Sequence, residues 1–346
     1  MRTTTNELWV AGYPSSVGGA DTELDHNIDL WCKQGVQVHL VPMFGVHAPM
    51  QALCDARGCL THEYHPGVFR DKVVVSFCNG EFLARLPEIV AQGKPAAVVW
   101  FNCMTWAFEA ELEAHRNGWI DFFGFVSEYQ KGWLLPHLEA VAPVRELEGY
   151  RPYFSLDNLS QQLSFNYRKP HDWFAMGRVS RDDGAKFSSD MWNIFHKVCS
   201  PRPTKTFVLG FGEHAKEKCG DPPPGLDWMA WEPGALRVPE FYERLHLLIH
   251  KTGGSRESYG RVIPEAYASG VPVIVEDDYA FPDLVLDGMT GFRCNSSDEM
   301  SFRASELAFD EPLRKRMVYA ARDFLLHDIA APDKCWQAWK SLLCDI

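Results

Sequence analysis

Short apolar runs alternate with amphipathic stretches along most of the chain. Apolar runs of about four to eight residues are typical of buried strands, and apolar residues spaced three and four apart are typical of helices. Their regular alternation predicts parallel sheets with helices on both faces, which is the doubly wound α/β arrangement. The strands expected in the first half are Leu8–Gly12, Val36–Val41, Val73–Phe77, Ala96–Phe101 and Phe122–Ser127, and the helices are Asp21–Gln34, Glu81–Ala91 and Phe108–Asn117.

The alternation weakens between residues 141 and 169, where prolines stand among polar residues, and then restarts. Such a stretch is typical of a domain junction. We therefore expect a first domain over residues 1–160 and a second over 161–329, with the closing helix at 330–346 packing back on the first. The second half should contain strands at Trp173–Gly177, Thr206–Leu209, Leu247–His250 and Val271–Val275, and helices at Ser188–Val198, Val262–Ser269, Phe281–Leu286, Ser297–Phe309, Leu313–Leu325 and Asp333–Leu343.

The net charge and the spacing of the cysteines limit the classes of function and the cellular compartment that we expect. The formal net charge is −12 and no run of Lys and Arg is longer than three residues, which argues against nucleic acid as the main partner. The ten cysteines form no C-x-x-C pair, so we expect reduced, mostly buried thiols in a cytoplasmic protein. His62-Glu63-Tyr64-His65 has two histidines at a metal-ligand spacing, but no second pair follows, and a surface loop is the better interpretation.

The chain begins with a polar segment, and its apolar runs are far shorter than the ~20 residues of a membrane-spanning helix. We therefore expect no secretory leader and no transmembrane segment. The oligomeric state leaves no signature in the sequence.

The strongest functional segment runs from His250 to Val275. A strand ends near His250, a loop rich in glycine and serine follows, and a helix starts near Arg261. Amide groups at a helix start, together with the helix dipole, favour an anion such as a diphosphate. Glu257 lies in the loop, within reach of sugar hydroxyls. Glu265 lies just over one turn into the helix, and its carboxylate suits the two hydroxyls of a ribose.

Two further segments carry candidate ligand groups. Phe174–Lys186 reads FAMGRVSRDDGAK, in which Arg178 and Lys186 offer the planar fork and the point charge that suit a diphosphate. Arg181 is an alternative to Lys186. After the first strand, the loop contains Gly18 and Gly19 but lacks the G-x-G-x-x-G pattern, which disfavours a nicotinamide dinucleotide.

These segments together resemble the family 4 retaining glycosyltransferases, which have the GT-B fold. The segment ESYGRVIPEAYASGVPVI is similar to the family's E-G-F-G-x-x-x-x-E-A-x-A-x-G-x-P-V-I signature, with Ser258 in place of the usual glycine. The resemblance implies that Glu257 and the backbone amides after it, at Ser258, Tyr259, Gly260 and Arg261, contact the donor sugar. It implies that Glu265 binds the ribose, that Arg178 and Lys186 clamp the diphosphate, and that Gly18 and Gly19 lie near the donor phosphates.

The first half departs from this family at one point. Relatives carry a histidine after the fourth strand, whereas this chain has Asn102. An amide can hydrogen-bond a sugar but cannot act as a base, so Asn102 either replaces the histidine in binding alone or leaves its role to another residue. Ser127, which precedes a helix-like stretch, is best interpreted as its N-cap.

We therefore expect two doubly wound domains facing a cleft, and a retaining glycosyltransferase that uses a nucleotide-sugar donor, UDP-sugar first and GDP-sugar next. The acceptor is not identified: glycan, lipid, small metabolite and protein all stay open. Without a D-x-D motif, no metal site and no cofactor are expected. Two alternatives stay open. One is a nucleotide-sugar epimerase or hydrolase using groups such as His47, His65 and Glu128; the other is a catalytically silent sugar-nucleotide binding module.

Overall fold

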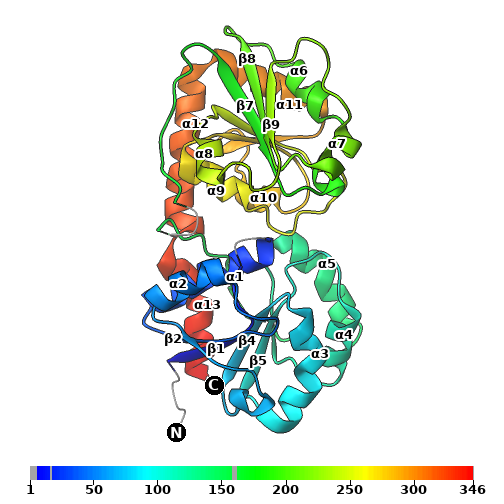
Figure 1. The fold of residues 1–346 in the computed structure, drawn as a ribbon, viewed down its shortest axis with the longest axis vertical. Helices are drawn as coiled ribbons and strands as arrows, with labels where there is room; N and C mark the ends of the chain where they lie inside the picture. Colours follow the sequence, from blue (N-terminus) through cyan, green and yellow to red (C-terminus); the bar gives the residue numbers. More distant parts are fainter. Residues whose placement is uncertain (1–5, 16–17, 158–161, 346) are drawn as a thin grey trace. The chain divides into compact units, whose positions relative to one another are not determined.

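The computed structural model describes residues 6–15, 18–157 and 162–345. The chain divides into two compact units, one of Met1–Ser160 with Ile329–Ile346 and the other of Gln161–Asp328. The junction expected at 160/161 falls outside the described residues. Each unit contains its own sheet and its own apolar core (Figure 1).

In the described part of the first unit, six parallel strands are ordered β3-β2-β1-β4-β5-β6. Figure 1 shows α1 and α13 on one side of this sheet and α3, α4 and α5 on the other. The elements are β1 (Glu7–Ala11), α1 (Gly19–Lys33), β2 (Gln37–Val41), α2 (Ala48–Ala56), β3 (Leu60–Thr61), the 3-10 turn η1 (Pro66–Phe69), β4 (Val73–Phe77), α3 (Gly80–Glu88), the π-helical turn η2 (Ile89–Gly93), β5 (Ala97–Phe101), α4 (Glu109–Arg116), β6 (Phe122–Gly124), α5 (Glu128–Glu139) and α13 (Pro332–Asp345).

The described part of the second unit repeats this topology, because its six parallel strands are ordered β12-β11-β10-β7-β8-β9. Its elements are β7 (Phe174–Val179), the 3-10 turn η3 (Gly184–Lys186), α6 (Met191–His196), β8 (Thr204–Leu209), α7 (Glu213–Cys219), β9 (Trp228–Trp231), α8 (Val238–Tyr242), β10 (Leu247–His250), α9 (Val262–Ser269), β11 (Val273–Glu276), α10 (Phe281–Leu284), β12 (Gly291–Cys294), α11 (Ser297–Phe309), α12 (Glu311–Phe324) and the π-helical turn η4 (Leu325–Ile329).

The sequence pattern explains the central strands. Val73–Phe77 and Ala97–Phe101 are buried at every position, as expected for strands covered on both faces, and they read as continuous apolar runs. The doubly wound α/β fold expected from the sequence is confirmed. The sequence analysis missed the short edge strands β3, β9 and β12, because two to four residues with exposed or polar members give no clear period.

The closing helix α13 belongs to the first unit. Trp339 is completely buried, and its ring meets Trp31 of α1 edge-on with centroids 4.8 Å apart. Its ring also lies 5.8 Å from those of Phe101 and Tyr150. The last residues of the chain thus complete the core that the first 160 residues begin.

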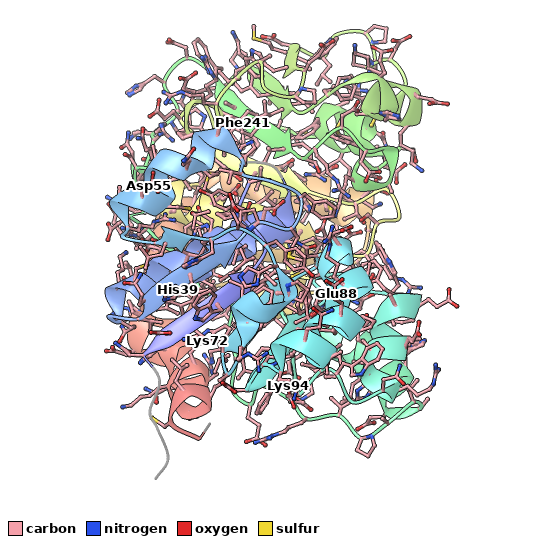
Figure 2. All side chains as sticks on the ribbon, turned by 60° about the horizontal axis from the view of Figure 1, so that its bottom comes forward. His39, Asp55, Lys72, Glu88, Lys94 and Phe241 are labelled. Atoms are coloured by element: carbon pink, nitrogen blue, oxygen red, sulfur yellow. The ribbon has the colours of Figure 1, made fainter. Side chains whose placement is uncertain are left out.

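The expected loop of His62–His65 is observed, but it is not detached from the sheet. The rings of His39 and His62 stack on Trp9 with centroids 4.2 and 4.7 Å away. Lys72, labelled with His39 in Figure 2, lies over the same indole and pairs with Glu7 at 3.0 Å. Stacking on a strand residue explains why His39 and His62 serve packing, whereas His65 is exposed.

In each unit the strand order reverses beside the first strand, between β1 and β4 and between β7 and β10. Loops that follow the two strands at such a point diverge and leave room for a ligand. The candidate loops after β1, β7 and β10 all begin there.

Candidate functional site

Two of the predicted loops meet in the second unit, after the neighbouring strands β7 and β10. The amides of Gly253 and Ser255 both donate to the carbonyl oxygen of Ala185 at 2.9 Å, which ties the loop after β10 to the turn η3. Gly253 is required at this contact, because a Cβ there would lie 1.9 Å from the carbonyl oxygen of Phe187. The sequence segments around Lys186 and Glu257 are therefore parts of one site.

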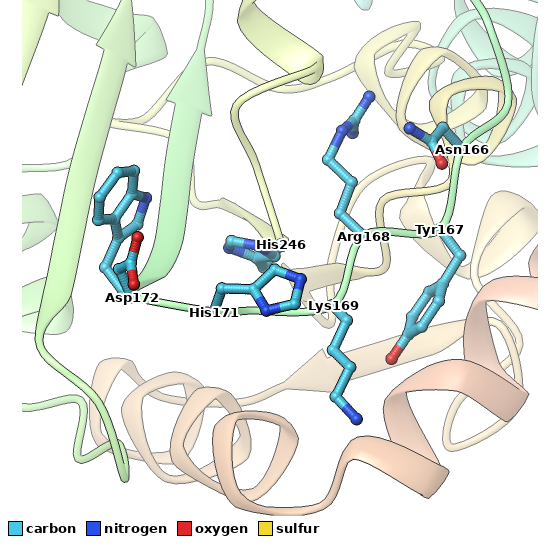
Figure 3. Close-up of a pocket in the computed structure, with 8 residues that line it drawn as sticks. Asn166, Tyr167, Arg168, Lys169, His171, Asp172 and His246 are labelled. Atoms are coloured by element: carbon cyan, nitrogen blue, oxygen red, sulfur yellow. The ribbon is translucent and has the colours of Figure 1, made fainter.

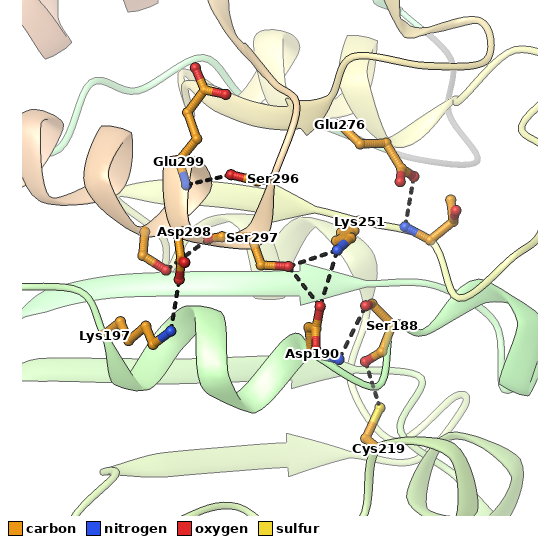
Figure 4. Close-up of polar contacts among 12 residues, drawn as sticks. Ser188, Asp190, Lys197, Cys219, Lys251, Glu276, Ser296, Ser297, Asp298 and Glu299 are labelled. Atoms are coloured by element: carbon orange, nitrogen blue, oxygen red, sulfur yellow. Dashed lines mark hydrogen bonds and ion pairs between the residues drawn. The ribbon is translucent and has the colours of Figure 1, made fainter.

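A second set of bonds fixes the base of these loops (Figure 4). The amide of Thr252 donates to the carboxylate of Glu276 at the end of β11, at 2.8 Å. Lys251 donates to Ser297 at 2.7 Å and pairs with Asp190 at 3.3 Å, and Ser297 also donates to Asp190 at 2.8 Å. The loop after β10 is thus anchored to three neighbouring elements before it reaches Glu257.

Lys186 and Glu257 form an ion pair, with Nζ and Oε1 2.7 Å apart. Both side chains are largely buried, with 17% and 13% of their surface exposed. Burial by itself would raise the pKa of Glu257, but the neighbouring His250 and Lys186 lower it to about 2. Glu257 is therefore a carboxylate at neutral pH, and its partner ammonium has further N–H groups to offer a ligand.

His250, at the carboxyl end of β10, is a site residue that the sequence analysis used only as a strand end. It is 2% exposed, and its Nε2 lies 3.9 Å from Oε1 of Glu257. Its ring packs edge-on against Phe281 with centroids 5.2 Å apart. Burial, and then the charge of Arg178, lowers the pKa of His250 to about 4, so the imidazole is neutral at pH 7. Its place at the end of a strand beside the reversal point was the available signal.

The sequence suggested that Arg178 is an accessible clamp for the diphosphate, but the structure shows its side chain buried. Only 1% of it is exposed, and its guanidinium donates to the carbonyl oxygens of Val179 and Lys186. Burial lowers the pKa of Arg178 to about 10, so it keeps its charge. Its direct effect is to hold the backbone of Lys186 in place. Arg181, the alternative cation, has an exposed side chain paired with Asp183 at 3.3 Å.

Glu265 lies on α9, as expected, but within its first turn, because the helix begins at Val262. The buried hydroxyl of Tyr242 donates to its Oε2 at 3.1 Å and also to the carbonyl oxygen of Val262 at 3.0 Å. The bond from Tyr242 therefore orients the Glu265 carboxylate through one of its two oxygens.

The residues between the two glutamates form the approach to the helix. Ser258 is half-buried, and Tyr259 is buried with the guanidinium of Arg261 5.6 Å from its ring centroid. At Gly260, a Cβ would lie 2.9 Å from the ring of Phe281.

The predicted residues of the first unit lie at the carboxyl ends of their strands. Gly18 has a φ of 104°, which favours glycine, and precedes the first residue of α1, Gly19. Asn102 is 2% exposed, and its amide donates to the carboxylate of Glu111 at 2.5 Å and to the carbonyl oxygen of Trp106 at 3.0 Å. The Asn102 side chain is therefore engaged within its own loop. Ser127 caps α5 by accepting from the amide of Gln130 at 3.0 Å.

Two structural features, a metal-binding cluster and a membrane-spanning helix, are absent from the described residues. Within 6–15, 18–157 and 162–345, no group of three or more His, Cys, Asp or Glu side chains is arranged to hold a metal ion. Over the same ranges, no helix combines the length and apolar character needed to cross a membrane.

Comparison with known proteins agrees with this geometry. Residues 230–324 match the family model described as glycosyl transferases group 1, a segment that includes both Glu257 and Glu265. A search of curated protein sequences finds no match.

Solved structures match over nearly the whole chain. The chain is similar to Anabaena HepE in complex with UDP and glucose (14% identity, 97% of this chain and 98% of that one, TM-score 0.69). It is also similar to a glycosyltransferase from Rickettsia africae (12%, 99% and 99%, 0.71) and to sucrose-phosphate synthase from Thermosynechococcus elongatus (13%, 98% and 100%, 0.66). At these identities the likeness shows the fold. The fold and the matched segment together identify the chain as a glycosyltransferase with the GT-B fold.

Proposed function

We propose that the chain transfers a sugar from a nucleotide-sugar donor with retention of anomeric configuration and without a metal ion. The observation that carries the proposal is the Lys186–Glu257 pair beside the start of α9, at the strand-order reversal of the second unit. It joins a cation, a carboxylate and helix amides in one place. UDP-sugar is the preferred donor and GDP-sugar the next, since Anabaena HepE has been solved with UDP-glucose.

The proposed roles follow from the position of each side chain. Lys186 keeps one N–H for Glu257 and turns the others to the donor diphosphate, together with the amides at the start of α9. This charge stabilises the phosphate as it leaves, the work that a metal ion would otherwise do. Arg178 supports Lys186 through its carbonyl oxygen. Glu265 accepts from the ribose hydroxyls.

Glu257 faces the sugar, where a carboxylate stabilises positive charge at the anomeric carbon. The bond from that carbon to the phosphate oxygen breaks, and the acceptor oxygen forms its new bond on the same face. The proton of the acceptor hydroxyl passes to the departing phosphate. Gly18 and Gly19 keep their proposed roles in donor binding. The side-chain N–H groups of Asn102 are bonded to Trp106 and Glu111, so its proposed role is limited to accepting a sugar hydroxyl at its carbonyl oxygen. The ten free cysteines suit a reducing compartment, which supports a cytoplasmic location.

A direct test needs no acceptor. Thermal shift with UDP, GDP and their glucose conjugates should show stabilisation by UDP and UDP-sugar first, because a ligand that binds the folded state stabilises it more, the further its concentration exceeds its dissociation constant. Incubation with radiolabelled UDP-sugar should then release free sugar slowly and with its configuration retained, equally with and without excess EDTA. An epimerised nucleotide sugar, an inverted product or loss of turnover restored by Mg²⁺ would contradict the proposal, and so would a donor bound but never cleaved.

A further inference from the structure

A cavity of about 420 Å³ lies at the amino ends of β7 and β10, at the end of the second unit's sheet opposite to the Lys186–Glu257 site (Figure 3). It is lined by the segment Asn166–Trp173, except Pro170, and by His246. Its volume is within the range of small-molecule sites, and the proposed transfer reaction makes no use of it.

The wall of this cavity is held from several sides. Asn166 donates its amide to the carbonyl oxygen of Ser269 at 3.4 Å, and the carbonyl oxygen of His171 accepts from Arg202 at 2.7 Å. Arg168 donates from one guanidinium nitrogen to the carbonyl oxygen of Tyr242 at 3.0 Å. Hydrogen bonds to three residues outside the segment therefore hold the wall of the cavity in place.

His246 presents a hydrogen-bond donor to the cavity. Its Nδ1 accepts the amide N–H of Ala175 at 2.9 Å. A neutral imidazole that accepts at Nδ1 must carry its proton on Nε2. In the described part of the chain, no hydrogen bond is formed by this Nε2. Figure 3 shows the imidazoles of His171 and His246 side by side, with Arg168 and Lys169 pointing to opposite sides of the segment.

Several positively charged side chains act on His246 in this cavity, although the chain carries a net charge of −12. Burial lowers the pKa of His246 to about 4, with additional lowering from the charges of Arg314, Arg168, His171 and Arg202. Arg314 is itself 1% exposed, so its charge acts with little screening by water. Lys169 is already paired with Glu311 at 3.2 Å.

The opposite side of the cavity offers a carboxylate and an indole. Asp172 lies there, away from Arg168 (Figure 3), and Trp173, which also lines the cavity, follows it in the chain. A carboxylate accepts hydrogen bonds from hydroxyl groups, and an indole offers a flat apolar face. The cavity thus has a cationic side and a side suited to hydroxyl groups.

We propose that this cavity binds a small phosphate monoester of a sugar or another polyol. The phosphate takes hydrogen bonds from Nε2 of His246 and from Arg168, and the hydroxyl-bearing part lies against Asp172 and Trp173. The site is separate from the donor site and is independent of the proposed transfer reaction.

Calorimetry with glucose 6-phosphate as the probe, with and without excess UDP, tests the proposal. We expect the same affinity in both titrations, much weaker binding of inorganic phosphate, and none of glucose. Arg168→Gln should weaken the probe about tenfold or more, because a charge-assisted bond is lost. His246→Asn should do the same, since its amide oxygen can still accept from Ala175 while the Nε2 donor is gone. In NMR titrations the probe should raise the pKa of His246.

The matched control is Arg237→Gln, which removes one positive charge from an exposed position before α8. It should leave the affinity unchanged. His171→Ala, at an exposed position, provides a variant whose folding is not at risk. Because the imidazole of His171 lines the cavity beside His246, its removal should also weaken the probe. Absence of binding, equal binding of inorganic phosphate, displacement by UDP, or equal loss in Arg237→Gln would each overturn the proposal.

Discussion

At the scale of single residues, the site depends on charges that are removed from water and satisfied by one another. Glu257 is held by Lys186, and Lys186 is held through its backbone by Arg178. The sequence indicated Arg178 and Lys186 as partners of the diphosphate and Glu257 as a partner of the donor sugar. It could not indicate that Lys186 and Glu257, 71 positions apart, pair with each other, because this follows from the adjacency of β7 and β10.

Arg178→Gln should lower stability as well as nucleotide binding. Its removal leaves buried carbonyl oxygens without a charged donor, which costs on the order of 3 kcal/mol. We expect a clear fall in the melting temperature and weaker UDP binding. Arg181→Gln, at an exposed position of the same loop, should change the melting temperature little. A stable Arg178→Gln protein with weakened UDP binding would instead support direct contact with the donor.

His250 makes stability depend on pH. Its pKa is about 4 in the folded chain, below the ordinary value near 6.5, so the unfolded state binds more protons between these values. The contribution is fully present above pH 6.5 and is lost as the pH falls to about 4. It amounts to roughly 3 kcal/mol. The free energy of unfolding in urea should therefore fall between pH 7 and 4.5 less steeply in His250→Leu than in the natural chain. Removal of an exposed histidine, His137→Gln, should leave the slope unchanged. Equal slopes in all three proteins would exclude this role.

At the scale of elements, buried helices and strands could be predicted from the sequence more accurately than exposed ones. The boundaries of β4, β10, α9 and α11 were predicted as observed, because long apolar runs and helical periodicity are strong signals. Strand β9 was missed because Trp228 and Met229 are exposed at the edge of the sheet. The candidate loops were found because they follow central strands, whereas their internal bonds depend on tertiary structure.

The contact between the loop after β10 and η3 gives a prediction at this scale. Gly253→Ala would place a methyl group within the backbone of Phe187, so the loop must move away from η3. We expect a cost of roughly 1–3 kcal/mol and UDP binding weakened at least tenfold, measured by calorimetry. Gly132→Ala, in α5 with open space around the added Cβ, is the control; it should leave UDP affinity unchanged and raise stability by about 0.5–1 kcal/mol. Unchanged UDP affinity in Gly253→Ala would show that the contact does not position the site.

At the scale of the whole molecule, two units carry separate cores, and the chain returns to the first unit at its end. The repetition of one strand order in both sheets could be predicted as a fold class from the alternation of strands and helices. The packing of Trp339 between Trp31 and Phe101 depends on the return of α13, which no local pattern specifies.

Trp339→Ala should destabilise the first unit by about 3–5 kcal/mol, as for other buried aromatic residues. Hydrogen exchange should show this loss in β1, β4 and β5, while the amides of β7 and β10 keep their protection and UDP still binds. Gln337→Ala, at an exposed position of the same helix, should alter neither unit. Equal loss of protection in both sheets would mean that the units unfold as one.

The central claim is that one motif divides the donor between two glutamates, and paired mutants test it most directly. Glu265 lies on α9 and is assigned to the ribose, so Glu265→Ala should weaken UDP and the full donor alike. Glu257 is assigned to the sugar, and Glu257→Gln keeps its size while releasing Lys186 from the ion pair. UDP affinity should therefore be retained in Glu257→Gln, and donor cleavage should fall roughly a hundredfold, as for loss of a preorganised electrostatic contact. Calorimetry with UDP and single-turnover cleavage of labelled UDP-sugar, both at matched stability, give the two readouts. Weakening of UDP by Glu257→Gln as large as that by Glu265→Ala, or unchanged cleavage in Glu257→Gln, would contradict the account.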